Sequence, residues 1–319
     1  MIARKRFALF AWAVLAFNIP VILWGAYVRI SFSGDGCGDH WPFCNGQVIP
    51  THMAAPMAIE FTHRAMTGVD TIAVLAMCVW AFLAFPRKHA VRFYAALSVL
   101  FLFIEAMLGA GLVLLQLVNH NHSAWRAVYL SAHFTNTMLL LGILTATAWA
   151  ASSGIERIEW RRAPRVLPVA MLVVIAVSIA GTIAALGDTL FPSATLVGGM
   201  ERDFSSTTSM LLRLRMVHPF LAIAGAAYLL YVAGRILQRH EAGPLRRAAS
   251  AVLLLILCQL AAGMVNLALL APMYMQLLHL FLADMLWISV VVLTLTGTRE
   301  RVTEPAHLMS FQANALTRH

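Results

Sequence analysis

Five ionisable side chains in apolar stretches are the residues of this sequence that could do chemistry. Glu60 and His63 stand three positions apart, a spacing that places a carboxylate and an imidazole on one face of a helix. Three more histidines lie in other apolar stretches, at His133, His218 and His279. Ionisable groups within membrane-spanning segments are costly and usually mark functional sites. We therefore expect a site here, although each histidine taken singly could also be a hydrogen-bonded packing residue.

Haem is the ligand that suits this set of residues. Two imidazoles from facing helices can bind a haem iron from both sides, and four-helix bundles often build cofactor sites from inward side chains. Zinc fits less well, because a closed zinc site needs four converging ligands and no short-spaced His or Cys group offers them. Arginines near the expected outer helix ends could pair with haem propionates, or could simply anchor the helices at the membrane surface. These are Arg64, Arg126, Arg213 and Arg215.

Two cysteines, Cys37 and Cys44, lie in a Gly-, Pro- and Asp-rich stretch between the first two apolar segments. This composition predicts an irregular loop, and the loop is expected on the outer side of the membrane, where disulfides persist. A disulfide or a redox-active dithiol is therefore expected. Spacing alone does not separate a structural staple from an exchangeable pair, so both alternatives stay open.

Composition indicates a polytopic membrane protein. Hydrophobic residues make up 61% of the 319 residues and charged residues 12%, and the mean hydropathy is +0.78, whereas soluble domains are about 45–50% apolar. A membrane-spanning helix needs roughly 20 apolar residues. The first such segment is expected to remain as a helix, because its apolar core is too long for a cleavable signal peptide. The eight predicted segments are 7–29, 60–85, 92–117, 128–151, 166–187, 211–236, 248–270 and 274–297.

The orientation of these segments follows from the basic residues. The connections on the side of the two termini hold most of the 23 Lys and Arg residues, so the positive-inside rule predicts that both termini are cytoplasmic. The histidines are then expected towards the outer face. Topology thus accounts for the net charge of +9, and no nucleic-acid partner is required.

The second half of the sequence repeats the first in outline. In each half, the first span contains a glycine and the second span a histidine. The third span contains an acid or an amide followed by a glycine, and the fourth span contains another histidine. These sets are Gly25/His63 and Gly181/His218, then Glu105/Gly109/His133 and Gln259/Gly263/His279. Four spans in each half make the repeat parallel, which turns the four histidines into two equivalent pairs.

The predicted fold is therefore all-α, with eight transmembrane helices arranged as two pseudo-symmetric four-helix bundles. The expected units are an N-terminal bundle, a cytoplasmic linker, a C-terminal bundle and a cytoplasmic tail. Their predicted bounds are residues 1–151, 152–165, 166–298 and 299–319.

Together these features resemble the haem A synthase family, also described as haem O oxygenases, in its subgroup with a cysteine pair in the first outer loop. The resemblance rests on Ile-Glu-Phe-Thr-His-Arg at residues 59–64, on Cys37/Cys44 with Trp41-Pro42 and Asn45-Gly46, on the eight spans and on the four histidines. It covers residue 7 to about residue 297. It implies a cell (inner) membrane oxidoreductase that converts the C8 methyl group of haem O, through an alcohol, to the formyl group of haem A for terminal cytochrome oxidases.

The resemblance also implies roles for single residues. His63 and His133 would bind the iron of the substrate haem O, and His218 and His279 would bind the iron of a haem b that relays electrons. Glu60 would handle protons or stabilise positive charge at the methyl carbon.

The cysteine pair would take part in haem handling or redox transfer. A haem O synthase is the implied source of the substrate, and the electron acceptor and a homo-oligomeric state stay open. Two other functions compete with this one. A bis-histidine b-type cytochrome would use the four histidines for electron transfer alone, and it should tolerate Glu60→Gln. A transporter would account for the repeat but would leave the paired histidines unexplained.

Overall fold

The computed structural model describes residues 2–204 and 210–316, and it describes side chains at residues 4–199, 201 and 212–299. Within the described residues, eight helices are long and apolar enough to cross a membrane, and their ends lie within a few residues of the predicted segments. The prediction of an all-α polytopic membrane protein with eight such helices is confirmed.

Four long helices form the first bundle, in which each helix packs against the next and the fourth closes back onto the first. Two of them have N-terminal caps: the Ser123 hydroxyl accepts a hydrogen bond from the Arg126 N–H, and the His89 ring accepts one from the Val91 N–H. Gly154, in the left-handed conformation, ends the fourth helix. The helices are α1 (Ile2–Ile30), α2 (Ala55–Ala84), α3 (Ala90–Leu114) and α4 (Ala124–Ser153).

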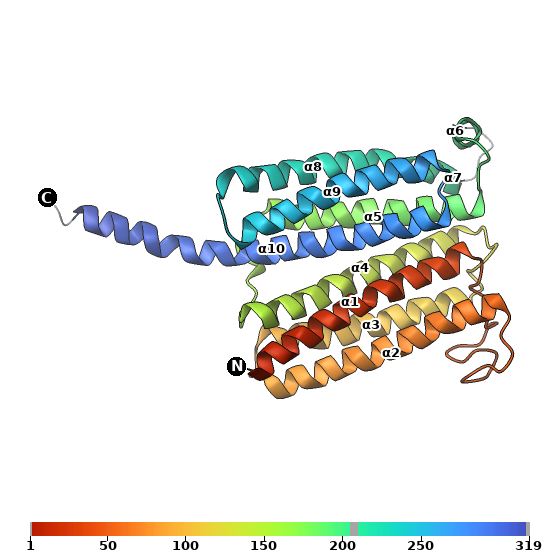
Figure 1. Cartoon of the computed structure of the whole chain (residues 1–319), viewed down its shortest axis with the longest axis horizontal. Coiled ribbons are helices and arrows are strands. Elements are labelled where there is room, and N and C mark those ends of the chain that lie inside the picture. The colour runs from red at the N-terminus through yellow and green to blue at the C-terminus, as the bar shows by residue number, and fades with distance from the viewer. Residues whose placement is uncertain (1, 205–209, 317–319) are drawn as a thin grey trace.

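Four further long helices form the second bundle, which lies beside the first in Figure 1. They are α5 (Val166–Leu190), α8 (Val217–Arg239), α9 (Pro244–Ala268) and α10 (Met273–Leu316). The cyclic order of packing is α5, α8, α9 and α10, which matches the order α1 to α4 and is consistent with a pseudo-symmetric pair of bundles. Helix α10 continues beyond its apolar part, so the predicted tail at 299–319 is helical as far as Leu316, and Figure 1 shows it projecting past both bundles.

Three short helices complete the described part of the chain: two lie in connections, and the third forms the start of the sixth span. They are η1 (Trp160–Arg162), α6 (Leu196–Phe204) and α7 (Met210–Arg215). The sixth predicted span, residues 211–236, is interrupted at Met216 between α7 and α8. Pro219 accounts for the interruption, because proline has no N–H to donate to the Arg215 carbonyl and its ring crowds that carbonyl.

The two bundles meet mainly through α4 and α10, with α1 and α5 beside them. Trp287 of α10 is 1% exposed, and its Nε1 atom donates a hydrogen bond to the Met138 carbonyl of α4 at 2.6 Å. Gly142 of α4 makes room for the indole ring, since a Cβ atom there would lie 3.2 Å from Trp287 Cζ2. The buried core therefore runs through both bundles as one unit.

We expect Trp287→Phe to lower the free energy of unfolding by about 1 kcal/mol, because it removes one buried hydrogen bond between the bundles and keeps an aromatic ring. The measurement is thermal unfolding of the detergent-solubilised protein, followed by circular dichroism. Trp125→Phe is the control. Trp125 lies on α4, the helix that accepts the Trp287 hydrogen bond, but its side chain is 67% exposed. Equal effects of the two substitutions would contradict a role for Trp287 in holding the bundles together.

Candidate functional site

The four predicted histidines lie at one end of the bundles. Helices α2, α4, α8 and α10 all begin at the end opposite the N-terminus, and each carries one histidine near its start. With a rise of 1.5 Å per residue, these histidines lie about 9–14 Å from the starts of the apolar helices. They are His63 in α2, His133 in α4, His218 in α8 and His279 in α10.

Each histidine packs against a glycine of the long helix that precedes its own. A Cβ atom would lie 3.0 to 3.1 Å from the histidine Cε1 atom at three of these glycines, where it would press on the imidazole, and 3.7 Å from it at Gly109, an ordinary contact. The spacings of the sequence repeat thus correspond to contacts in both bundles. The pairs are Gly25 with His63, Gly109 with His133, Gly181 with His218, and Gly263 with His279.

The histidines of each bundle are on helices that are not neighbours in the ring of four. The ring centroids of His218 and His279 are 6.4 Å apart. The Nδ1 atoms of His63, His133, His218 and His279 are all buried and have no hydrogen-bond partner among the described residues. A buried polar atom without a partner is costly, so these unpartnered atoms single out this end of the bundles as a candidate site.

Haem fits this donor set. Haem iron receives its equatorial ligands from the porphyrin and needs only axial ligands from the protein, and two imidazoles supply them. In the described part of the chain, no three His, Cys, Asp or Glu side chains converge as a bare metal ion would require. The glycines beside the rings leave space at the imidazoles. Each bundle therefore has the residues to hold one haem.

The loop between α1 and α2, residues 31–54, is closed by a disulfide between Cys37 and Cys44, one of the two predicted states of this pair. Both cysteines are buried, with exposed fractions of 0% and 1%. Cys44 exchanges two backbone hydrogen bonds with Gln47. Gly36 approaches the start of α2 so closely that a Cβ atom would lie 2.5 Å from the Pro56 carbonyl. This disulfide loop is therefore a compact element fixed on α2.

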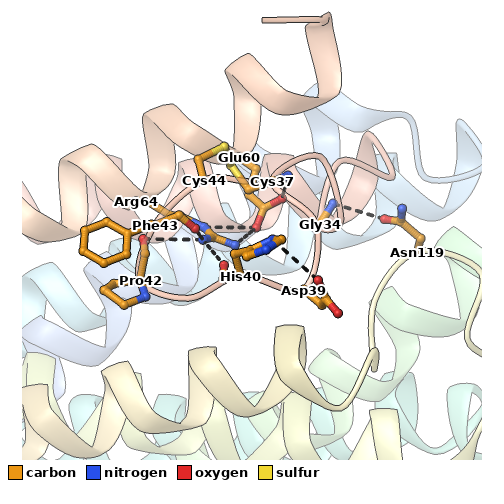
Figure 2. A network of polar contacts seen from close by, with 10 residues as sticks. All are labelled: Gly34, Cys37, Asp39, His40, Pro42, Phe43, Cys44, Glu60, Arg64 and Asn119. Carbon is orange, nitrogen blue, oxygen red and sulfur yellow. Dashed lines mark hydrogen bonds and ion pairs between the residues drawn. A yellow bond between two sulfur atoms is a disulfide. The ribbon is translucent and has the colours of Figure 1, made fainter. Parts of the chain in front are cut away.

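Glu60 and Arg64 of α2 hold the disulfide loop in place (Figure 2). Glu60 is 3% exposed, and its Oε2 atom accepts a hydrogen bond from the Cys37 N–H at 2.8 Å. Its Oε1 atom accepts one from Arg64 Nε at 3.1 Å. Arg64 Nη1 also donates to the carbonyls of His40 and Phe43, at 2.6 and 2.7 Å. A cation and a backbone donor thus fix the carboxylate one helical turn before the histidine of α2.

A carboxylate in this position distinguishes the first bundle from the second. Glu60 precedes His63 by three residues, and Arg215 precedes His218 by three residues. Arg215 forms an ion pair with Asp188 at 2.9 Å. The bundles therefore share the frame of histidines and glycines and carry opposite charges at this position.

The four arginines predicted to contact haem propionates have different environments. Arg64 and Arg126 donate to loop carbonyls, Arg215 pairs with Asp188, and Arg213 is exposed. A contact with propionates stays a prediction for all four.

Arg29 is a residue near this end of the bundles that the sequence reasoning missed. Its guanidinium donates to the Ala185 carbonyl at 2.7 Å, to the Thr189 hydroxyl, and to Gln276 Oε1 at 3.2 Å. It thereby ties α1 of the first bundle to α5 and α10 of the second. A single arginine in the last turn of an apolar segment was the available indication, but the partners are more than 150 residues away in the sequence.

Comparison with known proteins relates this chain to haem metabolism. The family model COX15-CtaA, cytochrome oxidase assembly protein, matches residues 8–291. The chain is 42% identical over 302 residues to a protein of Thermus thermophilus named protoheme IX farnesyltransferase, covering 94% of this chain and 49% of that protein. It is 34% identical over 113 residues to the heme A synthase of an Exiguobacterium species, covering 35% of this chain and 38% of that protein. With the heme A synthase of Geobacillus kaustophilus it is 38% identical over 104 residues, 33% of each. The matches thus span about half of the Thermus relative and about a third of each heme A synthase.

Proposed function

Because the chain belongs to the COX15-CtaA family of cytochrome oxidase assembly proteins, we propose that it is a haem A synthase. This membrane oxidoreductase oxidises the C8 methyl group of haem O to the formyl group of haem A, which terminal cytochrome oxidases use. The names of the heme A synthases that match about a third of the chain support this proposal.

A difference in charge next to the two histidine pairs carries the proposal. The first bundle has Glu60 three residues before its first histidine, and the second bundle has Arg215 there. Electron transfer alone needs no carboxylate at either site. Oxidation of a methyl C–H bond releases a proton together with electrons, and a carboxylate at the site can take up that proton. The first bundle is therefore the substrate site of the proposal, and the second is the cofactor site.

In the proposed mechanism, His63 and His133 bind the iron of the substrate haem O. His218 and His279 hold a haem b, which supplies one-electron redox chemistry when it is bound. Glu60 takes up a proton at its carboxylate or stabilises positive charge at the methyl carbon. Its two donors, described above, keep this carboxylate at a constant position one turn from His63, so the reacting group does not have to be ordered when the substrate enters.

The proposed location is the cell (inner) membrane, with both termini cytoplasmic and the histidines towards the outer face, as the distribution of basic residues indicates. The apolar tail of haem O would stay in the bilayer while its ring enters the first bundle. A haem O synthase is the proposed donor of the substrate. The proposed propionate contacts are Arg64, Arg126, Arg213 and Arg215.

Two other functions make different predictions. Farnesyl transfer is suggested by the name of the Thermus relative, but half of that protein lies outside the match, so the name alone does not assign this activity to the matched half. A bis-histidine cytochrome that only transfers electrons would use the four histidines without Glu60.

One expression experiment separates the three functions. The protein is produced in membranes that make haem B, with and without a haem O synthase, and the extracted haems are identified by mass and absorption. Haem A or its hydroxymethyl precursor in the presence of haem O would support the proposal. Haem O in membranes without the synthase would indicate farnesyl transfer. Haems B and O alone, with a low-spin bis-histidine spectrum, would contradict the proposal and favour the cytochrome.

The glycines beside the histidines give a further prediction about haem binding. Gly25→Ala should reduce haem retention, because the new Cβ atom would lie 3.0 Å from His63 Cε1 and 3.2 Å from its Nε2. Gly109→Ala is the matched control, since its Cβ atom would lie 3.7 Å from His133 Cε1, an ordinary contact. Overpacking typically costs about 1–3 kcal/mol, whereas Ala in place of Gly favours a helix by about 1 kcal/mol.

The measurement is the haem content of each purified variant, together with its unfolding temperature. We expect a loss of haem in Gly25→Ala and a neutral or stabilising effect in Gly109→Ala. Equal behaviour of the two variants would contradict the importance of the close contact at Gly25.

A further inference from the structure

The carboxylate of Glu105 in α3 lies beside His133 and is held there by two donors from α4. Its Oε1 atom is 3.2 Å from His133 Nδ1. Asn136 Nδ2 donates to Glu105 Oε2 at 2.6 Å, and the Thr137 hydroxyl donates to Oε1. Glu105 therefore bridges α3 and α4 at the histidine, and the mechanism proposed above does not use it.

The second bundle has a neutral residue in the matching place. Gln259 precedes Gly263 by four residues, as Glu105 precedes Gly109. Its Nε2 atom lies 3.3 Å from His279 Nε2. The fourth-helix histidine of each bundle thus has a polar neighbour from the third helix, an acid in the first bundle and an amide in the second. The two neighbours face different ring nitrogens, Nδ1 of His133 and Nε2 of His279.

The donors that serve Glu105 are also replaced in the second bundle. Asn136 and Thr137 follow His133 by three and four residues, and the residues at the same distances after His279 are Leu282 and Ala283. A carboxylate within an apolar bundle is costly unless donors satisfy it. The acid occurs with both donors and the amide with neither, so the difference between the bundles involves three positions on two helices.

His133 Nδ1 makes no hydrogen bond among the described residues, although Glu105 Oε1 lies within hydrogen-bonding distance of it. We propose that Glu105 is a positioning residue that accepts the Nδ1–H of His133 when a haem is bound, leaves Nε2 free for the iron, and makes this imidazole a stronger electron donor than His279. Carboxylates act in this way on many metal-bound histidines. A more basic axial ligand favours ferric iron, so the haem of the first bundle has the lower reduction potential. This order of potentials favours electron transfer from the first haem to the second. The inference rests on the haem binding proposed above.

The test compares variants that exchange the two environments. The purified protein is loaded with haem B as the probe, and the midpoint potentials of both haems are measured by redox titration followed by absorption. Glu105→Gln should raise the midpoint potential of the haem in the first bundle and weaken haem retention in that bundle by roughly 10- to 100-fold. Gln259→Glu is combined with Leu282→Asn and Ala283→Thr, which supply the donors. This triple variant should lower the midpoint potential of the haem in the second bundle.

Asp70→Asn is the matched control. Asp70 is a buried carboxylate of the same bundle, and it accepts a hydrogen bond from Asn18 at 2.9 Å rather than lying against a histidine. This variant should leave both potentials unchanged.

The outcomes separate this inference from the proposed function. Bound haem with unchanged potentials in Glu105→Gln, or the same shift in Asp70→Asn, would overturn the inference and leave the proposed function intact. A wild-type protein that binds no haem would overturn both. If Glu105→Gln does not fold, the triple variant of the second bundle decides, because a potential that does not fall there overturns the inference.

Discussion

Glu60→Gln is expected to reduce haem A formation by about 100-fold or more, while the protein keeps its haem spectrum. Glutamine has nearly the same shape as glutamate, but it carries no charge and is a poor proton acceptor. Its amide group would also point N–H atoms at one of the two donors, Arg64 or the Cys37 N–H, that now bind the carboxylate. The histidines are unchanged, so haem binding should persist. The measurement is haem extraction from cells that make haem O, with the product quantified per amount of protein.

Asp70→Asn is the control for this experiment too, because it removes a buried carboxylate from the same helix, about three turns further along. It should leave product formation close to that of the wild type. Product at the wild-type level in Glu60→Gln would contradict the role assigned to Glu60. The difference between the two histidine pairs would then carry no catalytic meaning, and electron transfer alone would be the better explanation of the four histidines.

The helices and the repeated glycine–histidine pairs could be predicted because they depend on local patterns. Long apolar runs fix the membrane-spanning helices whatever lies beside them. The repeat places Gly25 before His63 and Gly181 before His218 at nearly the same spacing, and the two contacts in the structure have nearly the same geometry. The interruption before α8 was missed, although Pro219 was available as a local indication.

The partners of the polar residues could not be predicted from local patterns. Glu60 is bound by a backbone N–H of a loop 23 residues earlier, and Arg29 by groups of the other bundle. Such contacts depend on which helix faces which, and hydropathy does not determine that. Glu105 shows the same difficulty, because its position opposite Asn136 and Thr137 follows only from the packing of α3 on α4.

Removing the disulfide by Cys37→Ser with Cys44→Ser is expected to lower the free energy of unfolding by about 2.5 kcal/mol, from the entropy of the short loop that it closes. Activity should also fall, because the Cys37 N–H that positions Glu60 belongs to this loop. The measurements are thermal unfolding and haem A formation. Unchanged stability and activity would contradict a structural role for the disulfide.

The burial of both cysteines favours a structural disulfide over a redox-active cysteine pair. Thiol–disulfide exchange needs access to a sulfur atom, and Cys37 and Cys44 have exposed fractions of 0% and 1%. We therefore expect a reductant to leave the disulfide intact until the protein unfolds, as measured by thiol labelling and mass spectrometry in detergent. The positive control is the same labelling after unfolding in denaturant, where both loop cysteines should react once a reductant is present. Rapid labelling of the loop cysteines in the folded protein would instead favour redox exchange.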